Sequence, residues 1–232
     1  MQNVVAAAIA FVGTHFLLSH PLRVPLVRAI GDKGFLGLYS LVAFATLIWL
    51  ALAYRAAPAE TPLWPVGDGL WAIGTVLMLA GAILLAGAIL FMGSLVRNPA
   101  LPETKINAVP EARGVFAITR HPMMWGFALW GLVHILVFPD PSNIVLALAI
   151  IVLALVGAHL QDRKKESLQP DFWREWQRRT SYWPFAAIAA GRARIGTIGM
   201  HALGGGLVVW LLATWAHLPL ASWPAGIWRW IV

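Results

Sequence analysis

The sequence predicts an all-α membrane protein: a polytopic helical bundle of about six transmembrane helices with the N- and C-termini outside. Hydrophobic residues make up 59% of the 232 residues, and only 12% are charged. Soluble domains carry about twice that charged fraction. Several apolar runs of about 17 residues or more are long enough to cross the hydrocarbon core of a bilayer. The runs leave no room for a separate soluble domain, so residues 1–232 are expected to form a single membrane domain.

The first four expected spans cover residues 4–18, 35–54, 70–95 and 122–138. The first ends just before Pro21, which disfavours straight continuation of a helix. The third places Gly74, Gly81 and Ala88 one heptad apart. Such a stripe of small residues lets a neighbouring helix approach closely, so its expected role is packing.

The second part of the chain predicts two further spans, at residues 144–160 and 200–218. A polar stretch, residues 161–195, lies between them. Its aromatic residues are expected at the level of the lipid headgroups; they are Trp173, Trp176, Tyr182 and Trp183. The tail, residues 219–232, looks too short to span and is expected to rest in the membrane interface.

The distribution of positive charge predicts the orientation. All of the 17 Lys and Arg residues except Arg55 and Arg229 fall in the loops after the first, third and fifth spans. Cytoplasmic loops of membrane proteins carry this excess, which places both termini outside. The net charge of +7 therefore indicates topology, and the expected partner is the lipid bilayer rather than nucleic acid. The start, Met1-Gln2-Asn3, has no basic residue, so the first span is not expected to be a cleaved signal peptide.

Histidine is the main metal or haem ligand that this sequence offers. The chain has no cysteine, which excludes disulfides, thiolate catalysis and cysteine-ligated metal. Of the seven histidines, His15 and His134 are expected closest to the middle of the membrane, where an imidazole is costly without a partner. No compact His/Asp/Glu spacing favours zinc.

Two facing helices could place His15 and His134 on opposite sides of a haem iron. A rise of 1.5 Å per residue leaves them about 8 Å apart in depth, part of which helix tilt could absorb. Pairing His15 with His159 is geometrically as good. The alternative is that His134 only packs in the bundle and bonds a backbone carbonyl.

Arg120 and His121 precede Pro122, which suits the first turn of a helix. Free N–H groups and the helix dipole favour an anion there, so Arg120 and His121 are candidates for binding a carboxylate or phosphate. The alternative is helix capping with contact to lipid headgroups. Glu166 is a candidate partner for Arg120 or a ligand group, and otherwise an exposed loop carboxylate.

Several segments together resemble the NnrU family over residues 4–195. They are Gly13-Thr14-His15, residues 31–40, residues 118–134 from Ile118 to His134, and residues 179–185. Members of this family are bacterial inner-membrane proteins linked to the expression or function of nitrite and nitric oxide reductases in denitrification. The resemblance implies a multi-pass protein of the bacterial inner (cytoplasmic) membrane.

The same segments are similar to 15-cis-ζ-carotene isomerases, enzymes that use haem b to isomerise a polyene. That similarity implies haem b as cofactor, with its ligands at His15 and His134, or at His20 in place of His15. It also implies a hydrophobic polyene as a binding partner; another membrane protein is the alternative partner.

A weaker resemblance runs to isoprenylcysteine carboxyl methyltransferases, which bind S-adenosylmethionine at the cytoplasmic face. It rests on Arg120-His121-Pro122, Glu166 and residues 176–185 in that order. The chain departs from that pattern at Met124, where tyrosine is usual, and at Lys164-Lys165, where acids are usual. Three hypotheses follow: an NnrU-type accessory protein, a haem-dependent isomerase and a methyltransferase. The sequence favours the first and leaves open whether the protein is an enzyme.

Overall fold

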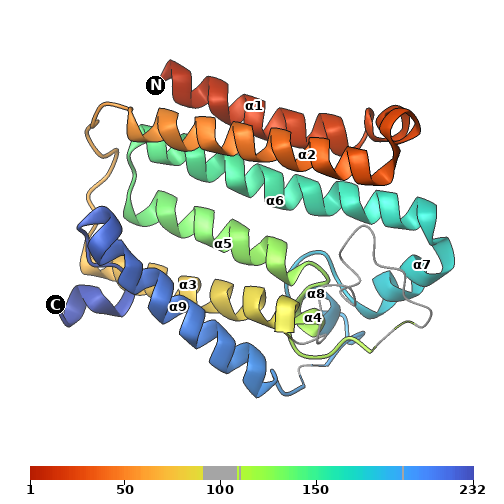
Figure 1. Cartoon of the computed structure of the whole chain (residues 1–232). Coiled ribbons are helices and arrows are strands. Elements are labelled where there is room, and N and C mark those ends of the chain that lie inside the picture. Colours follow the sequence, from red (N-terminus) through yellow and green to blue (C-terminus); the bar gives the residue numbers. More distant parts are fainter. Residues whose placement is uncertain (91–108, 110, 195) are drawn as a thin grey trace.

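The fold is known from a computed structural model that describes residues 1–90, 109, 111–194 and 196–232. These residues form helices and connecting loops and contain no strand, which confirms the all-α prediction (Figure 1). The elements are α1 (Gln2–Ser19), α2 (Arg23–Arg55), α3 (Asp68–Leu90), α4 (Val115–Ile118), α5 (Pro122–Val137), α6 (Pro141–Leu168), α7 (Pro170–Arg179), α8 (Ala186–Ala189), α9 (Met200–Ala221) and the 3₁₀ helix η2 (Gly226–Trp230). The end of the expected third span, residues 91–95, and most of the following loop lie outside the described residues.

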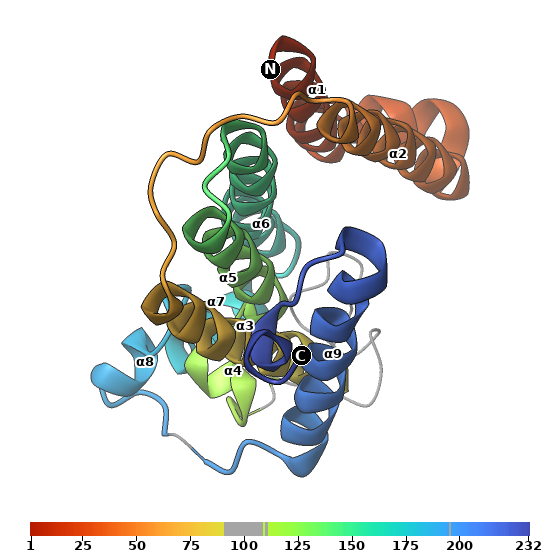
Figure 2. The ribbon, with the colours of Figure 1, turned by 90° about the vertical axis from the view of Figure 1, so that its left-hand side faces the viewer.

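The long helices pack one against the next in the order α2, α1, α6, α5, α3, α9. Figure 2 shows the pair α1 and α2 set apart from α3 and α9, with α6 and α5 between them. Helix α1 packs on α2 and α6, and α5 packs on α6 and α3. Helices α1 and α2 contact the rest of the bundle mainly through α6. This arrangement leaves space between them and α5.

Five helices in the described part of the chain are long and apolar enough to cross a membrane: α1, α2, α3, α6 and α9. The remaining expected span is α5, an apolar helix of 16 residues. Large apolar side chains such as Leu41, Phe44 and Leu52 of α2 are more than half exposed, as lipid-facing side chains are in a membrane. The protein is thus a multi-pass helical membrane protein, with both termini at one end of the bundle (Figure 1).

The fifth expected span differs from the structure at its C-terminal end. Helix α6 runs on to Leu168, so residues 161–168, expected in a loop, are helical. The buried face of α6 continues through Ala154, Ala158, Asp162 and Lys165, at helical spacing. This extension carries charged side chains into the bundle instead of into solvent.

Two of the four aromatic residues expected among the headgroups lie in the protein interior. Trp173 and Trp176 of α7 are fully buried in a cluster with Phe116 of α4. These two side chains pack inside the protein because α7 folds back and turns its apolar face onto α4. Trp183 fits the expectation better, since 63% of its surface is exposed.

Small residues bring α3 and α5 together. A Cβ atom added at Gly126 would lie 2.8 Å from the carbonyl oxygen of Gly81, closer than real Cβ contacts. Gly74 lies on α3 one heptad before Gly81, and a Cβ added there would lie 3.0 Å from the side chain of Val137 in α5. The packing role predicted for this stripe is therefore confirmed at both glycines.

Candidate functional site

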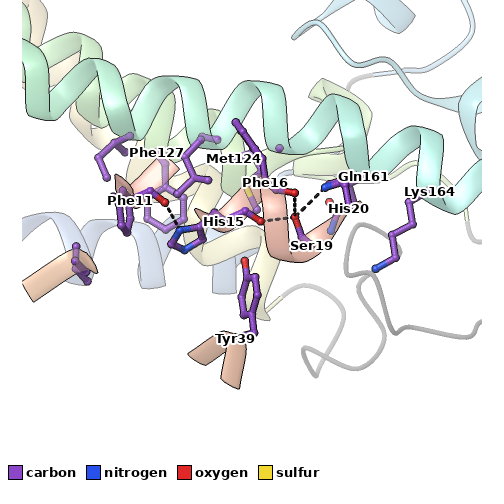
Figure 3. Close-up of a pocket in the computed structure, with 15 residues that line it drawn as sticks. Phe11, His15, Phe16, Ser19, His20, Tyr39, Met124, Phe127, Gln161 and Lys164 are labelled. Carbon is purple, nitrogen blue, oxygen red and sulfur yellow. Dashed lines mark hydrogen bonds between the residues drawn. The ribbon is translucent and has the colours of Figure 1, made fainter. Parts of the chain in front are cut away.

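A cavity of about 510 Å³ lies between α1, α2, α5 and α6 (Figure 3). We call it cavity 1. Most of its wall is apolar, including Phe11 and Phe16 of α1, Phe127 of α5 and Leu153 of α6. It occupies the gap that the arrangement of α1 and α2 leaves beside α5. An apolar cavity of this size with a few polar groups is the usual form of a small-molecule site.

His15 is a polar group in the wall of cavity 1. Its Nδ1 lies 2.6 Å from the carbonyl oxygen of Phe11, one helical turn earlier. The ring also makes edge contacts with Phe11 and with Tyr39 of α2, at centroid distances of 4.5 and 5.6 Å. Since a carbonyl oxygen can only accept, Nδ1 carries the proton in the neutral ring, and the Nε2 lone pair is left available.

One end of cavity 1, beside the C-terminal end of α1, is polar. Ser19, His20, Gln161 and Lys164 line it. The side-chain oxygen of Gln161 and Nε2 of His20 are buried, and neither has a hydrogen-bond partner among the described residues. Buried polar atoms normally have partners, so these two atoms indicate that a water or a ligand group binds at this end.

A buried ion cluster joins the start of α5 to the end of α6. The Arg120 guanidinium donates through Nε and one terminal nitrogen to Oδ2 of Asp162, at 2.8 and 2.5 Å. His121 donates through Nε2 to the other carboxylate oxygen at 2.7 Å, and its side chain has no exposed surface. The Asp162 carboxylate thus accepts hydrogen bonds from both Arg120 and His121, the two basic residues that the sequence indicates as a candidate anion site.

Tyr182 closes one side of this cluster. Its ring meets the edge of the His121 ring at 5.8 Å, and its hydroxyl donates to the carbonyl oxygen of Leu155 in α6. Burial, and then the nearby Asp162 carboxylate, raise the pKa of the Tyr182 phenol above its usual value. Tyr182 therefore stays neutral and acts as a hydrogen-bond donor.

The expected anion site takes a different form here. Arg120 and His121 both donate to a carboxylate of the protein itself, and the His121 side chain makes no capping hydrogen bond to α5. Nδ1 of His121 is buried without a hydrogen-bond partner among the described residues. Glu166, expected as the acidic partner, is exposed one turn beyond Asp162. The sequence does contain an indication of Asp162. It follows the small residues Ala154 and Ala158 at the same spacing of four residues, which places all three on one face of a helix.

His134 lies in a second cavity of about 470 Å³, which we call cavity 2. Its wall comes mainly from α3, α5 and α9, with Trp71, Val133 and Val137 among its apolar residues. His134 stands in the last turn of α5, which ends three residues later at Val137, one residue short of the expected end of this span.

The structure does not bring His15 and His134 together, because they line different cavities. His159 lines neither of them: it is exposed beside Tyr182. His20 does share cavity 1 with His15, but both residues come from the end of α1 and stand on one side. None of these pairs can occupy the two opposite sides of one haem iron, so the ligand set implied for haem b does not fit this arrangement.

The geometry defines a class of protein: a multi-pass helical membrane protein with two apolar cavities, each holding histidine. A family model matches the chain over residues 3–225, and the chain belongs to the NnrU protein family. The matched region also covers α9 and reaches the last residues before η2, beyond the resemblance noted over residues 4–195.

Two relatives bear the name 15-cis-zeta-carotene isomerase, chloroplastic. The protein from Zea mays is 30% identical over 135 residues, which cover 58% of this chain and 36% of the maize protein. The protein from Arabidopsis thaliana is 37% identical over 79 residues, covering 34% of this chain and 22% of that relative. The aligned segment is thus little more than a third of the maize protein and less than a quarter of the Arabidopsis protein. No solved structure matches the chain.

Proposed function

We propose that this protein is an isomerase of the bacterial inner membrane that changes a cis double bond of a long hydrophobic polyene to trans. Cavity 1 is the observation that carries the proposal. It is an apolar space inside the bilayer region, which suits a long apolar substrate. The polar groups at one end suit an opening of the cavity toward water. The names of the maize and Arabidopsis relatives give the reaction class.

The wall residues of cavity 1 have distinct roles in this proposal. The rings of Phe11, Phe16 and Phe127 hold the polyene by dispersion contacts along its length. His15 and Tyr39 meet it where the two helices α1 and α2 face each other. Isomerisation adds and removes no atoms, so the site must fix both halves of the substrate and leave one bond free to rotate.

Filling cavity 1 tests the proposal. Gly157 of α6 lines the cavity, and a Cβ placed there has only Phe16 within 4 Å, at 3.8 Å. The protein is reconstituted in lipid nanodiscs with 15-cis-ζ-carotene, and the ratio of isomers is followed by chromatography in the dark. We expect turnover by the wild type and a loss of roughly tenfold or more in Gly157→Phe, equivalent to about 1.4 kcal/mol or more in the barrier.

Gly204→Phe is the matched control, because Gly204 is exposed on α9 with nothing within 4 Å of an added Cβ. It should keep wild-type turnover. Absence of turnover in the wild type, or unchanged turnover in Gly157→Phe, would overturn the proposal.

A second candidate is an accessory role in the expression or function of nitrite and nitric oxide reductases. It is favoured by the family match, which spans nearly the whole chain whereas the isomerase alignments cover shorter segments. Deletion of the gene in its source bacterium, followed by assays of both reductases, tests it. Lowered reductase activity with unchanged polyene isomers would favour this candidate over the isomerase.

A further inference from the structure

We infer that the ligand of cavity 1 is an amphiphile: a long polyene that carries a hydroxyl group at one end. The inference rests on the proposed function and deepens it by naming the class of substrate. The apolar wall of cavity 1 suits the polyene chain. The polar end of the cavity, beside the C-terminal end of α1, determines which end group the chain carries (Figure 3).

Hydrogen bonds fix His20 as an acceptor. The hydroxyl of Ser19 donates to the backbone carbonyl oxygen of His15, one turn earlier, at 2.5 Å. The same hydroxyl oxygen lies 2.8 Å from Nδ1 of His20, and since its proton is already used, Nδ1 must be the donor in this contact. The neutral His20 ring therefore presents a lone pair at Nε2, which is buried and has no hydrogen-bond partner among the described residues.

Gln161 of α6 adds a second acceptor at this end. Its Oε1 is also buried, without a partner in the part of the chain that the structure describes. Buried acceptors without a donor are costly. Protonation of His20 would add a second positive charge to the end that already holds Lys164, and the described lining contains no carboxylate. This end of cavity 1 therefore favours a ligand group that donates a hydrogen bond.

A hydroxyl meets this requirement better than a hydrocarbon or an anion. It can donate to Nε2 of His20 or Oε1 of Gln161 and accept from the Lys164 ammonium. A hydrocarbon end would leave both acceptors unpaired, and a carboxylate would set its own lone pairs against them. Lys164 is only partly buried, so its ammonium can remain in contact with water and needs no anion in the cavity.

Anchoring one end of the polyene also fixes its register in the cavity. Phe11 lies nine residues before His20, which is roughly 13 Å along the axis of α1 at 1.5 Å per residue. A chain whose hydroxyl is held at His20 passes His15 and Tyr39 before it reaches Phe11. The end group therefore selects which double bond lies beside His15.

Retinol is the probe for the test, because it is a conjugated polyene with one terminal hydroxyl. The full chain is placed in lipid nanodiscs, binding of tritiated retinol is measured in the dark, and empty nanodiscs correct for partition into lipid. Retinyl methyl ether and ionised retinoic acid are the competitors. Neither can donate a hydrogen bond, so each should bind roughly tenfold more weakly than retinol or worse. Either competitor binding as tightly as retinol would overturn the inference.

The double variant His20→Phe/Gln161→Leu removes both acceptors. It should bind the methyl ether at least as tightly as wild type does and lose the preference for retinol. Binding of the ether also shows that the variant is folded. A preference for retinol that survives in this variant would contradict the roles of His20 and Gln161, and the comparison of ligands on wild type does not depend on the variant.

Two further variants locate the ligand. His201→Phe changes an exposed histidine of α9 and should keep both the affinity and the preference. Gly157→Phe fills cavity 1 and should lose retinol and ether alike; retention of retinol there would overturn the inference. Preference for retinol without turnover of 15-cis-ζ-carotene would reject the isomerase and keep the ligand class, whereas turnover without the preference would do the reverse.

Discussion

Asp162 is the residue that most affects how the charged groups of this protein are arranged. Arg120 and His121 both bond its carboxylate, and all three side chains are nearly or fully buried. Breaking a buried ion pair leaves the remaining charge without compensation, which costs far more than the pair contributes. The cluster therefore holds the start of α5 against the C-terminal part of α6.

Asp162→Asn should destabilise the fold by about 3 kcal/mol, because Arg120 would lose its ionic partner in a buried site. The measurement is equilibrium unfolding in detergent micelles. Glu166→Gln, an exposed change one turn along α6, should stay within about 0.5 kcal/mol of wild type. Equal stability of the two variants would refute this role for Asp162.

At the scale of the helices, close approach depends on positions that accept only glycine. Gly206 of α9 packs on α3, where an added Cβ would lie 2.6 Å from the Cα of Ile83. Two residues earlier, Gly204 has nothing within 4 Å. The two glycines lie on one helix and differ in what they face, so they form a matched pair.

Gly206→Ala should cost about 1–3 kcal/mol, since the backbone of α3 must move away from the new methyl group. Gly204→Ala should be neutral or stabilise by up to about 1 kcal/mol, because alanine favours the helix and meets no neighbour. Thermal unfolding in detergent compares them. If both alanines had the same effect, the close contact between α9 and α3 would be disproved.

Across the whole molecule, the basic loops and the termini lie at opposite ends of the bundle. Figure 1 shows both termini at one end and α4, α7 and α8 at the other. The connection from α2 to α3 lies at the end with the termini, where the backbone of Glu60 donates to Asp140 at 3.3 Å. The distribution of Lys and Arg predicts that the end with α7 faces the cytoplasm.

Because the chain has no cysteine, single cysteines report this orientation cleanly. Ala59, in the connection from α2 to α3, and Ser167, in the last turn of α6, are both exposed. These two segments lie at opposite ends of the bundle (Figure 1). Ala59→Cys should react with a membrane-impermeant maleimide in intact spheroplasts, and Ser167→Cys only after lysis. The reverse pattern would invert the topology.

The sequence alone could predict part of the candidate site. It singled out His15, His134, Arg120 and His121, and each of these lies at a cavity or in the ion cluster. It could not predict that His134 meets His217, because that requires knowing that α5 and α9 both pack on α3. It also predicts the acidic partner one turn too far along α6, at Glu166, because hydropathy alone ends this span at Leu160.

The sequence by itself determined the all-α class, the succession of apolar spans and their expected orientation. Hydropathy and charge determine these features because the composition of each span largely decides by itself whether that span inserts into the bilayer and in which direction. Only the tertiary structure decided which histidines share a cavity and which carboxylate Arg120 meets. Helices that are apolar on every side leave their neighbours and rotation undetermined by pattern, so packing between small residues and buried charges settles them.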